Sequence, residues 1–365
     1  MKLEFSTDEF GPHKVVYVFE PRIGLSGFVV VDNVACGPAI GGIRMVPDVT
    51  VEEVARLARA MTWKNAAAGL PHGGGKAGIV ADPSMDRAQK EEAIRAFGRA
   101  IRGLTEYIPG PDMGTDETCM AWLKDEIGRS IGLPRALGGI PLDTLGATGF
   151  GLAICAEVLE ELTPLRLKGA RIALQGFGAV GKHAARFLEQ RGATIVAVAD
   201  IGGGVYNPAG LPVSDLVAHK YPGQSVSSFP GGAPLSGDDF VAVDCDVWIP
   251  AARPDVLTEQ NIGRLRAKYV IQGANIPATS GAETWMHQHG ILSIPDFIAN
   301  AGGVICGAVE YRGGSQTEAF AVIEERIRDN TRTVLREAQT SGSTPRAAGE
   351  ALAKGRVMEA EGYRR

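Results

Sequence analysis

The sequence of 365 residues has little that would tie it to a membrane, a nucleic acid or an oxidising compartment. No apolar run reaches the roughly 18 uninterrupted residues of a transmembrane helix, and the polar, acidic start lacks the apolar core of a signal peptide. A net charge of −5 gives no electrostatic reason to expect nucleic acid as a partner. The 5 cysteines are widely separated and form no Cys-x-x-Cys pair, which favours reduced thiols over disulfides. We therefore expect a cytoplasmic protein with neither a nucleic-acid nor a membrane partner.

Metal ligands are also scarce. The 6 histidines are scattered, and the one close pair, His287 and His289, alternates along the chain rather than sharing a helix face. Because no segment supplies the usual ligand set, we expect no metal site. What the chain does have is 45% apolar and 22% charged residues, the composition of a soluble globular protein. Its length exceeds what one ordinary core accommodates and predicts two domains.

The first part of the chain predicts a mixture of strands and helices. Residues 14–20 and 25–32 are rich in β-branched and aromatic side chains, which is typical of strands. Apolar residues at helical spacing predict helices over 51–64, 86–104 and 115–128. Thr50 is the expected N-cap of the first helix. The density of glycine and proline then indicates a domain boundary near residues 135–148.

From residue 170 onward, short apolar segments alternate with helical patterns. This alternation predicts an α/β domain with a parallel sheet that is covered on both faces. Two charged helices are expected to follow it, over 318–340 and 345–359. The predicted strands of the sheet are residues 171–175, 194–199, 247–249, 269–272 and 291–294.

Lys64 and Lys76 flank the segment Asn-Ala-Ala-Ala-Gly-Leu-Pro-His-Gly-Gly-Gly, which is nearly free of large side chains. Its glycines and alanines would let the backbone approach a ligand closely. Two ammonium groups beside a compact apolar cavity should lower the pKa of one lysine, giving a base that works near neutral pH. The alternative interpretation is a pair of surface lysines beside a flexible glycine loop.

The segment Gly176-Phe177-Gly178-Ala179-Val180-Gly181 matches G-x-G-x-x-G, follows a predicted strand and opens a predicted helix. Its glycines allow a tight turn and close approach to a pyrophosphate, which the helix N-terminus favours. The next strand ends in Asp200, whose carboxylate should bind ribose hydroxyls and repel a 2′-phosphate. No Lys or Arg follows it in Ile201-Gly202-Gly203-Gly204, so we expect NAD, with NADP as the less favoured cofactor. A glycine-rich structural turn is the alternative.

Further motifs accompany this fingerprint. In chain order they are Gly37-Pro-Ala-Ile-Gly-Gly-Ile-Arg-Met45, the Lys64–Lys76 segment, Gly110-Pro-Asp-Met-Gly-Thr115, Gly146-Ala-Thr-Gly-Phe-Gly151, Gly273-Ala-Asn275 and Asn300-Ala-Gly-Gly-Val304. With them the chain resembles the amino-acid dehydrogenases that act on glutamate, leucine, phenylalanine and valine. The resemblance implies an α/β substrate-binding and oligomerisation domain at 1–140, to which helices within 325–365 return. It also implies a Rossmann NAD-binding domain at 141–324, an active site in the cleft between the domains, and a homo-oligomer.

The resemblance also implies roles for individual residues. Lys64 should hold the substrate α-carboxylate, Lys76 should activate the attacking water, and Asp112 should move protons at the amine. Thr148, Asn275 and Asn300 occupy positions that lie by the nicotinamide and ribose in the family, with turn formation or helix capping as their alternative role. The complete set predicted to bind the cofactor is Thr148, Gly176, Phe177, Gly178, Ala179, Val180, Gly181, Asp200, Ala251, Asn275 and Asn300.

Two positions depart from the glutamate dehydrogenases. Ile40 stands where those enzymes have a lysine for the distal carboxylate, and Gly307 stands where they have a serine. Burying a glutamate carboxylate without these partners should cost roughly several kcal/mol, so we expect an apolar substrate. Gly110 and Gly307 are expected to enlarge its pocket. The predicted substrate-binding residues are Lys64, Ile40, Gly41, Gly42, Met61, Gly110, Met113, Val304 and Gly307, with simple core packing as the alternative for Met61, Met113 and Val304.

The predicted function is the reversible, NAD-dependent oxidative deamination of an apolar L-amino acid, aromatic or branched-chain, to its 2-oxo acid and ammonia. Glutamate dehydrogenase is the alternative within the enzyme class, because Tyr206-Asn-Pro-Ala-Gly210 resembles the glutamate enzymes more closely. A dinucleotide-binding regulatory protein without catalysis is a further alternative, opposed by the joint presence of Lys64, Lys76 and Asp112. These patterns do not explain His72, where the family mostly has an apolar or aromatic residue.

Overall fold

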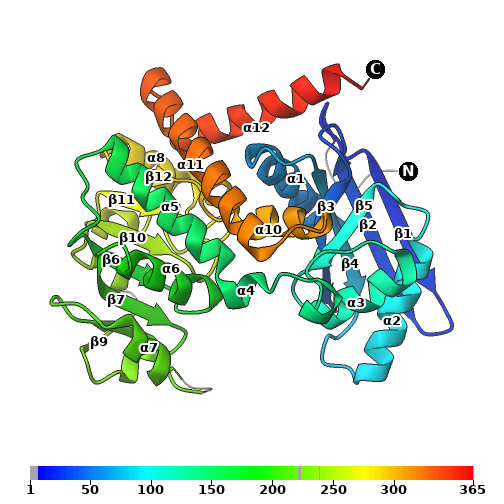
Figure 1. The fold of residues 1–365 in the computed structure, drawn as a ribbon, viewed down its shortest axis with the longest axis horizontal. Helices are drawn as coiled ribbons and strands as arrows, with labels where there is room; N and C mark the ends of the chain where they lie inside the picture. The colour runs from blue at the N-terminus through cyan, green and yellow to red at the C-terminus, as the bar shows by residue number, and fades with distance from the viewer. Residues whose placement is uncertain (1–6, 221–222, 238, 365) are drawn as a thin grey trace. The chain divides into compact units, whose positions relative to one another are not determined.

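The computed structural model describes residues 7–220, 223–237 and 239–364, so part of the acidic start lies outside the described residues. The chain forms two compact units (Figure 1). Unit 1 consists of residues 1–141, 304–320 and 350–365. Unit 2 consists of residues 142–303 and 321–349. Of the residues described, none belongs to a helix that is both long and apolar enough to span a bilayer.

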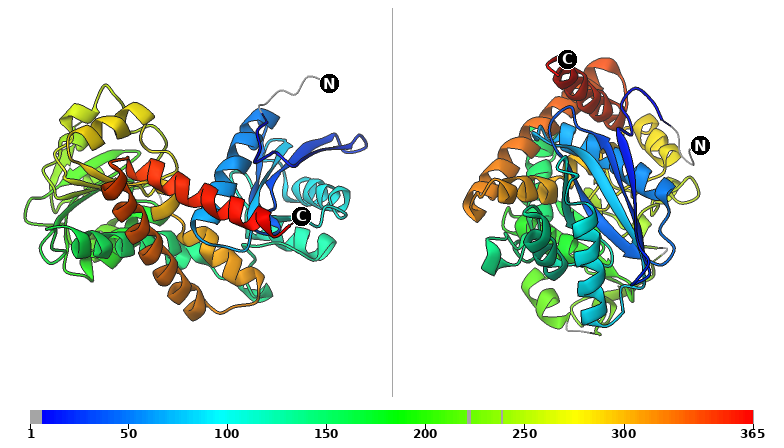
Figure 2. Two further views of the ribbon diagram at one scale, coloured as in Figure 1. Left: turned by 90° about the horizontal axis from the view of Figure 1, so that it is seen from above. Right: turned by 90° about the vertical axis from the view of Figure 1, so that its right-hand side faces the viewer.

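Unit 1 is built on a five-stranded sheet with the order β1-β2-β4-β3-β5. β1 and β2 form an antiparallel hairpin at one edge, visible in dark blue in Figure 2. β4 is antiparallel to β2, whereas β3 is parallel to both β4 and β5. The strands are β1 (Lys14–Glu20), β2 (Leu25–Asn33), β3 (Ala39–Val46), β4 (Gly73–Val80) and β5 (Tyr107–Pro111).

Both faces of this sheet are covered by helices, and the alternation of side chains along β2 shows how. Val29 and Val31 pack in the core that contains residues of α2 and α3. Phe28 and Val30 point the other way and pack in the core that contains residues of α1. The helices are α1 (Val51–Ala67), α2 (Arg87–Ala100) and α3 (Glu117–Ile127).

Side-chain caps fix where these three helices begin. The Thr50 hydroxyl accepts the N–H of Glu53, which confirms the predicted N-cap of α1. Asp86 and Asp116 cap α2 and α3 in the same way. The strands and helices predicted for residues 14–32, 51–64, 86–104 and 115–128 are thereby confirmed to within a few residues at their ends.

The three glycines directly before Lys76, residues 73–75, are not part of a loop but belong to β4, between β2 and β3. A Cβ added at Gly74 would lie 2.1 Å from the backbone nitrogen of Thr62 in α1. A Cβ at Gly75 would lie 3.0 Å from the ring of Tyr107. These glycines therefore let a helix and a neighbouring aromatic ring pack directly on the strand. The prediction that they bring backbone close to a ligand is wrong, because other parts of the chain occupy that space.

Unit 2 contains a seven-stranded sheet with the order β12-β11-β10-β6-β7-β8-β9. The strands from β12 to β7 are parallel, as predicted, whereas β8 and β9 add an antiparallel edge that the sequence did not predict. From the central β6 the chain builds outward on one side and then on the other, which creates a topological switch point between β6 and β10. The strands are β6 (Arg171–Gln175), β7 (Thr194–Asp200), β8 (Gly203–Tyr206), β9 (Ala233–Leu235), β10 (Val247–Pro250), β11 (Tyr269–Ile271) and β12 (Leu292–Ile294).

Helices cover this sheet as expected for a Rossmann-like domain, and the predicted α/β fold of two domains is confirmed. The helices within unit 2 are α4 (Leu142–Leu145), α5 (Ala147–Leu162), α6 (Ala179–Glu189), α7 (Val213–His219), α8 (Ser280–Gln288) and α9 (Asp296–Ala299). Residues of both units occur in α10 (Gly302–Tyr311), α11 (Gln316–Ser341) and α12 (Pro345–Gly362).

The C-terminal part of the chain divides differently from the prediction. A single return to the first domain was expected at residue 325, but residues 304–320 already belong to unit 1, and residues 321–349 belong to unit 2. Packing explains both assignments. A Cβ at Gly307 in α10 would lie 2.8 Å from Ile131 of unit 1, and a Cβ at Gly151 in α5 would lie 2.4 Å from Ile327 of α11.

Candidate active site

An ion pair in unit 1 joins two strands that are not neighbours in the sheet. Lys76 lies in β4, Asp112 follows the end of β5, and β3 runs between these strands. Lys76 Nζ is 2.9 Å from Asp112 Oδ2. The two side chains meet across Gly42 of β3, where an added Cβ would lie 2.7 Å from the Cβ of Asp112 and 3.3 Å from Lys76 Nζ. The absence of a side chain at Gly42 therefore permits the contact.

Arg44, two residues after Gly42 on the same face of β3, extends the ion pair into a cluster. Its Nε donates to Asp112 Oδ2 at 3.1 Å, and its Nη1 donates to Glu53 in the first turn of α1. The backbone N–H of Asp112 donates to the Thr115 hydroxyl at 3.0 Å. The carboxylate is therefore held by two cations while its backbone is fixed separately.

Burial and charge shift the pKa values of this cluster. Lys76 is 7% exposed, and burial lowers the pKa of its ammonium group, with a contribution from Arg44 and partial opposition from Asp112. Burial by itself would raise the pKa of Asp112, but Lys76 and Arg44 together bring it below its ordinary value. The expected neighbour that lowers the lysine pKa was Lys64, and the cation found in this role is Arg44. A lysine of lowered pKa beside a carboxylate of lowered pKa is suited to moving protons.

Lys64 and Met61 lie toward the C-terminal end of α1, and both are half-buried. The contact of Thr62 with Gly74 brings this part of the helix against β4, the strand that carries Lys76. Arg356 Nη1 donates to the carbonyls of residues 66 and 67 at 3.1 and 2.6 Å, which satisfies two acceptors at the helix end. The carboxylate-binding role of Lys64 stays a prediction.

Ile40, which is predicted to line the side-chain pocket, belongs to a small apolar cluster. Ile40 in β3 is 1% exposed and packs with Ile108 of β5 and with Ile131. A Cβ added at Gly110 would lie 2.9 Å from Ile131, and one at Gly307 would lie 2.8 Å from it. These two glycines therefore do not enlarge the pocket, contrary to the prediction, since Ile131 fills the space beside both.

Three other predicted pocket residues have different surroundings. A Cβ at Gly41 would lie 1.6 Å from the carbonyl oxygen of Gly75, so this glycine serves the contact of β3 with β4. Val304 is half-buried, and Met113 is 59% exposed, which excludes core packing as the role of Met113. The assignment of Val304 and Met113 to the pocket wall stays a prediction.

The structure accounts for His72 as a packed side chain. It is 7% exposed, its Nδ1 lies 3.2 Å from the carbonyl oxygen of Pro38, and its ring meets that of Tyr311 edge-on. Burial lowers its pKa, which favours the neutral imidazole. His72 thus takes the packing role that an aromatic residue would have at this position.

A cavity of about 930 Å³ lies within unit 2, where β6, β7 and β10 end. This is the region in which parallel α/β sheets bind ligands. Its lining includes five of the predicted cofactor residues, namely Gly176, Phe177, Gly178, Asp200 and Ala251. Ala179, Val180 and Gly181 form the start of α6, directly after this segment.

The three glycines of the fingerprint have separate tasks. Gly176 has a φ of 112°, and a Cβ there would lie 2.7 Å from the backbone of Ala251. A Cβ at Gly181 would lie 1.8 Å from the carbonyl oxygen of Gly176, so this glycine allows the close packing of helix on turn. At Gly178, no atom of the described residues comes within 4 Å of the added Cβ. The first and third glycines therefore serve packing, while the second leaves room for a pyrophosphate.

Both carboxylate oxygens of Asp200, at the end of β7, accept hydrogen bonds from other residues of the chain. Its Oδ1 accepts from the Gly202 N–H at 3.0 Å and the Ser225 hydroxyl at 2.6 Å. Its Oδ2 accepts from the Val226 N–H at 3.1 Å and the Lys220 ammonium at 2.6 Å. The argument that no cation offsets the charge of Asp200 is wrong, because Lys220 is distant in sequence but pairs with it and lines the same cavity.

Asn275 and Asn300 form a pair near the end of β11. Asn300 Nδ2 donates to Asn275 Oδ1 at 3.0 Å. Asn300 is 5% exposed, and within the described residues its Oδ1 has no hydrogen-bond partner. A buried amide oxygen without a donor indicates a ligand group that supplies one. Thr148, in the first turn of α5, lies beside Gly303, whose added Cβ would be 3.4 Å from the Thr148 hydroxyl.

Two family models match the chain. One, described as Glu/Leu/Phe/Val dehydrogenase, dimerisation domain, matches residues 15–129, and one described as Glutamate/Leucine/Phenylalanine/Valine dehydrogenase matches residues 138–365. The chain belongs to this family of amino-acid dehydrogenases. It is therefore an NAD(P)-dependent oxidoreductase that acts on the CH–NH2 group of an amino acid, as the resemblance implied.

Individual relatives of this amino-acid dehydrogenase agree with the assignment. Glutamate dehydrogenase of Aeropyrum pernix is 37% identical over 83% of the chain and 77% of the relative. The NADP-specific glutamate dehydrogenase of Saccharolobus shibatae is 36% identical over 90% of the chain and 82% of the relative. Both relatives are named for glutamate, the alternative substrate of the sequence analysis.

Solved structures of related enzymes have the same fold. The hetero-hexameric glutamate dehydrogenase from Thermus thermophilus, in a leucine-bound form, matches with a TM-score of 0.85 and 32% identity over 97% of the chain and 90% of that structure. L-tryptophan dehydrogenase from Nostoc punctiforme matches with a TM-score of 0.76 and 25% identity over 97% of the chain and 98% of that structure. The neighbours of this amino-acid dehydrogenase thus include enzymes named for a charged and for an aromatic substrate.

Several residues of this amino-acid dehydrogenase site were missed by sequence reasoning. Arg44 stands inside the Gly37–Met45 motif but received no role, because the strand that places it on the same face as Gly42 was not predicted. Gln175 directly precedes the fingerprint, lines the cavity and has a buried Oε1 without a partner among the described residues. Ile131 and Lys220 carry no local signal in the sequence, since only the fold brings them to the site.

Proposed function

We propose that Lys76 is the general base of the oxidative deamination and that Asp112 carries protons to and from the substrate amine. The observation that supports these roles is the buried 2.9 Å ion pair, in which the pKa of Lys76 is lowered by burial. Asp112 first takes a proton from the substrate ammonium group, and the substrate carbon then loses hydride to the cofactor. Lys76 takes a proton from the water that adds to this carbon. Asp112 returns its proton to the nitrogen, which leaves as ammonia while the new hydroxyl group loses its proton to solvent. Lys64 pairs with the α-carboxylate and fixes the orientation of the substrate.

We propose that the cavity of unit 2 holds the pyrophosphate and ribose of NAD or NADP against Gly176, Gly178 and Asp200. Asn275 and Asn300 then contact the nicotinamide end, for which Asn300 Oδ1, without a donor among the residues that the structure describes, supplies an acceptor. The bound cofactor supplies the hydride acceptor of the reaction. Because Lys220 offsets the charge of Asp200, both NAD and NADP fit the site.

For the substrate, we propose glutamate first, because the relatives that share 36% and 37% identity over most of the chain are named for it. Glutamate requires a cation or several N–H donors near its distal carboxylate, since a buried unpaired carboxylate is strongly destabilising. Ile40 cannot supply that partner, so the distal carboxylate has to be met by a different group.

An apolar amino acid is the second candidate, and the isoleucine wall favours it. Ile40, Ile108 and Ile131 are all buried and pack together, which suits an aliphatic or aromatic side chain and offers a carboxylate nothing. Since Ile131 takes up the space beside Gly110 and Gly307, this wall favours leucine-sized side chains over the larger aromatic ones.

Substrate identity is tested by measuring kcat/KM for twenty amino acids with NAD and with NADP. Glutamate as the best substrate supports the first proposal, and leucine, phenylalanine or tryptophan ahead of it supports the second. Ile40→Lys sharpens the test, with Ile40→Val as the matched control. If the pocket is apolar, the lysine variant gains activity toward glutamate. Its kcat/KM for the apolar substrate falls by at least about 10²-fold, because a charged group replaces a buried aliphatic side chain. Turnover of no amino acid would contradict both.

We also propose that the chain forms a homo-oligomer through unit 1. The match of residues 15–129 to a dimerisation domain supports this, as does the edge strand β1 with its half-exposed Tyr17 and its more exposed Phe19. Light scattering of the purified chain measures its mass, and a monomer at micromolar concentration would contradict the proposal.

A further inference from the structure

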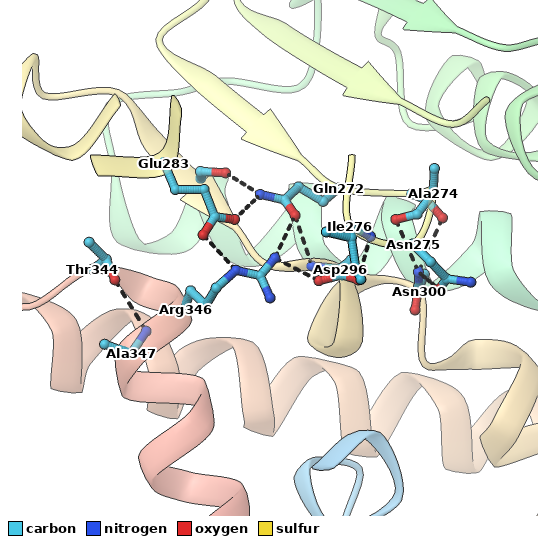
Figure 3. A network of polar contacts seen from close by, with 12 residues as sticks. Gln272, Ala274, Asn275, Ile276, Glu283, Asp296, Asn300, Thr344, Arg346 and Ala347 are labelled. Carbon is cyan, nitrogen blue, oxygen red and sulfur yellow. Dashed lines mark hydrogen bonds and ion pairs between the residues drawn. The ribbon is translucent and has the colours of Figure 1, made fainter. Parts of the chain in front are cut away.

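A buried polar network in unit 2 links the first turn of α12 to the loop that follows β11 (Figure 3). Arg346 Nε lies 2.5 Å from Glu283 Oε2, and Arg346 Nη2 lies 2.8 Å from Asp296 Oδ1. The same nitrogen donates to Gln272 Oε1 at 3.1 Å. Glu283 and Asp296 are 9% and 6% exposed, so one cation compensates two buried carboxylates.

Asp296 connects Arg346 to the loop that contains Ile276. Its Oδ1 is held by Arg346, and its Oδ2 accepts the backbone N–H of Ile276 at 2.8 Å. Ile276 has a φ of 47°, a left-handed conformation that is uncommon for a β-branched residue. The surroundings have to maintain such a conformation, and the bond from Ile276 to an oriented carboxylate does so.

The loop held in this way carries the asparagine pair. Asn275 directly precedes Ile276, and its Oδ1 accepts from Asn300 Nδ2 at 3.0 Å. Asn300 follows α9, and its backbone N–H donates to the carbonyl oxygen of Asp296 at 2.7 Å. Asp296 therefore fixes both asparagines, one through its side chain and the other through its backbone. The Oδ1 of Asn300, which has no partner in the described part of the chain, lies at the end of these contacts.

We infer that Arg346 is a positioning residue for the cofactor: by orienting Asp296, it sets the conformation of the 275–276 turn and hence the asparagine pair that receives the nicotinamide. This inference rests on the proposed contact of Asn275 and Asn300 with the nicotinamide end. Arg346 is distant in sequence from the fingerprint, and its effect is specific to one end of the cofactor, because the pyrophosphate residues belong to a different strand and helix.

A second arginine cluster of unit 2 supplies a matched control. Arg328 in α11 pairs with Glu157 and Glu161 in α5 and with Glu324 in its own helix. It joins two helices through several carboxylates, as Arg346 joins two segments. Among the described contacts, however, none of these carboxylates bonds a predicted cofactor residue or its neighbour, as Asp296 bonds Ile276 and Asn300. Loss of Arg328 should therefore reveal what the removal of an arginine cluster does to the unit in general.

The test compares Arg346→Met with Arg328→Met by calorimetry, using NADH and ADP-ribose, or NADPH and 2′-phospho-ADP-ribose if the parent chain prefers them. ADP-ribose lacks the nicotinamide and reports on the remainder of the site. Arg346→Met is expected to weaken NADH binding by about tenfold or more while ADP-ribose binding changes by less than about twofold. Arg328→Met should leave both ligands within about twofold.

Two further variants keep the outcome decisive. Asp296→Asn preserves the shape of the network and removes one charge, so it replaces Arg346→Met if that variant does not fold, and it should weaken NADH selectively as well. Asn300→Ala tests the proposed nicotinamide contact directly. If Asn300→Ala binds NADH like the parent, the proposed contact is wrong. If Asn300→Ala weakens NADH but neither Arg346→Met nor Asp296→Asn does so, or if they weaken ADP-ribose equally, the positioning role of Arg346 is overturned.

Discussion

The two units of the chain use glycine in opposite ways. In unit 1, a Cβ added at Gly74 would lie 2.1 Å from Thr62, and one at Gly41 would lie 1.6 Å from Gly75. In unit 2, a Cβ at Gly178 would meet no atom of the described residues within 4 Å. Because Gly74 and Gly41 have no side chains, β4 can contact α1 and β3 can contact β4 directly. Gly178 leaves space for a group that is not part of the chain.

This difference teaches that a glycine run by itself does not indicate a ligand loop. The glycines before Lys76 are part of a strand between two others, whereas Gly178 lies in the turn between a strand and a helix that is open to a cavity. The two sites also differ in origin. The cluster of Lys76, Asp112 and Arg44 draws on three strands, whereas the phosphate-binding turn is one contiguous segment.

The largest expected effect is a loss of turnover on substitution of Lys76 in unit 1, without a loss of cofactor binding in unit 2. Lys76→Ala should lower kcat by at least about 10²-fold, because the base is lost. The Kd for NADH, measured by fluorescence, should stay within about twofold, because the cavity of unit 2 is unchanged. Lys124→Ala, at an exposed position of α3, is the control. Wild-type turnover of Lys76→Ala would remove this lysine from the mechanism.

The contrast between the glycines predicts opposite outcomes for two alanine substitutions. Gly74→Ala should destabilise the protein by about 1–3 kcal/mol, because the added methyl group has to displace α1. Gly178→Ala should change stability by less than about 0.5 kcal/mol and instead weaken NADH binding. Urea unfolding midpoints and binding titrations measure both effects. The contrast breaks if Gly178→Ala proves the less stable variant.

Substitution of Arg44, the second cation beside Asp112, should shift the pH dependence of kcat/KM. Lys76 has to be deprotonated to act as a base, so activity falls as the pH drops below its pKa. Arg44 helps to lower that pKa, so Arg44→Met should raise it and displace the acidic limb of kcat/KM toward higher pH. We expect an activity loss of about tenfold at neutral pH. Arg56→Met, an exposed arginine of α1, should leave the profile in place, and a shift of the Arg44 variant toward lower pH would contradict the argument.

The smallest expected effect concerns the choice of cofactor. Lys220→Met should leave the charge of Asp200 without its cation and favour NAD over NADP by about fivefold more than in the parent, which corresponds to about 1 kcal/mol. The Kd values of NADH and NADPH at fixed salt measure the shift. Lys168→Met, exposed in the same unit, is the control. An unchanged ratio would mean that Lys220 has no part in recognising the 2′-phosphate.

Local signals made much of the fold predictable. The strands at 171–175 and 194–199, the helix after the fingerprint and the cap at Thr50 all depend on neighbouring residues, so the sequence indicates them directly. The strands β3, β4 and β5 were not predicted. All three contain glycine and β5 also contains proline, residues of low strand propensity. They are strands because neighbouring strands satisfy their backbone hydrogen bonds.

The sequence by itself determined the family, the two-domain α/β organisation and the chemical groups of the site. Each of these depends on motifs of consecutive residues, which can be identified without the structure. Only the tertiary structure decided which groups meet. It paired Asp112 with Arg44 as well as Lys76, placed Lys220 on Asp200, and put Ile131 beside Gly110 and Gly307. Such contacts follow from the strand order of a sheet and the return of distant segments, and no local pattern encodes either, since a side chain's partner across a sheet is unrelated to its neighbours along the chain.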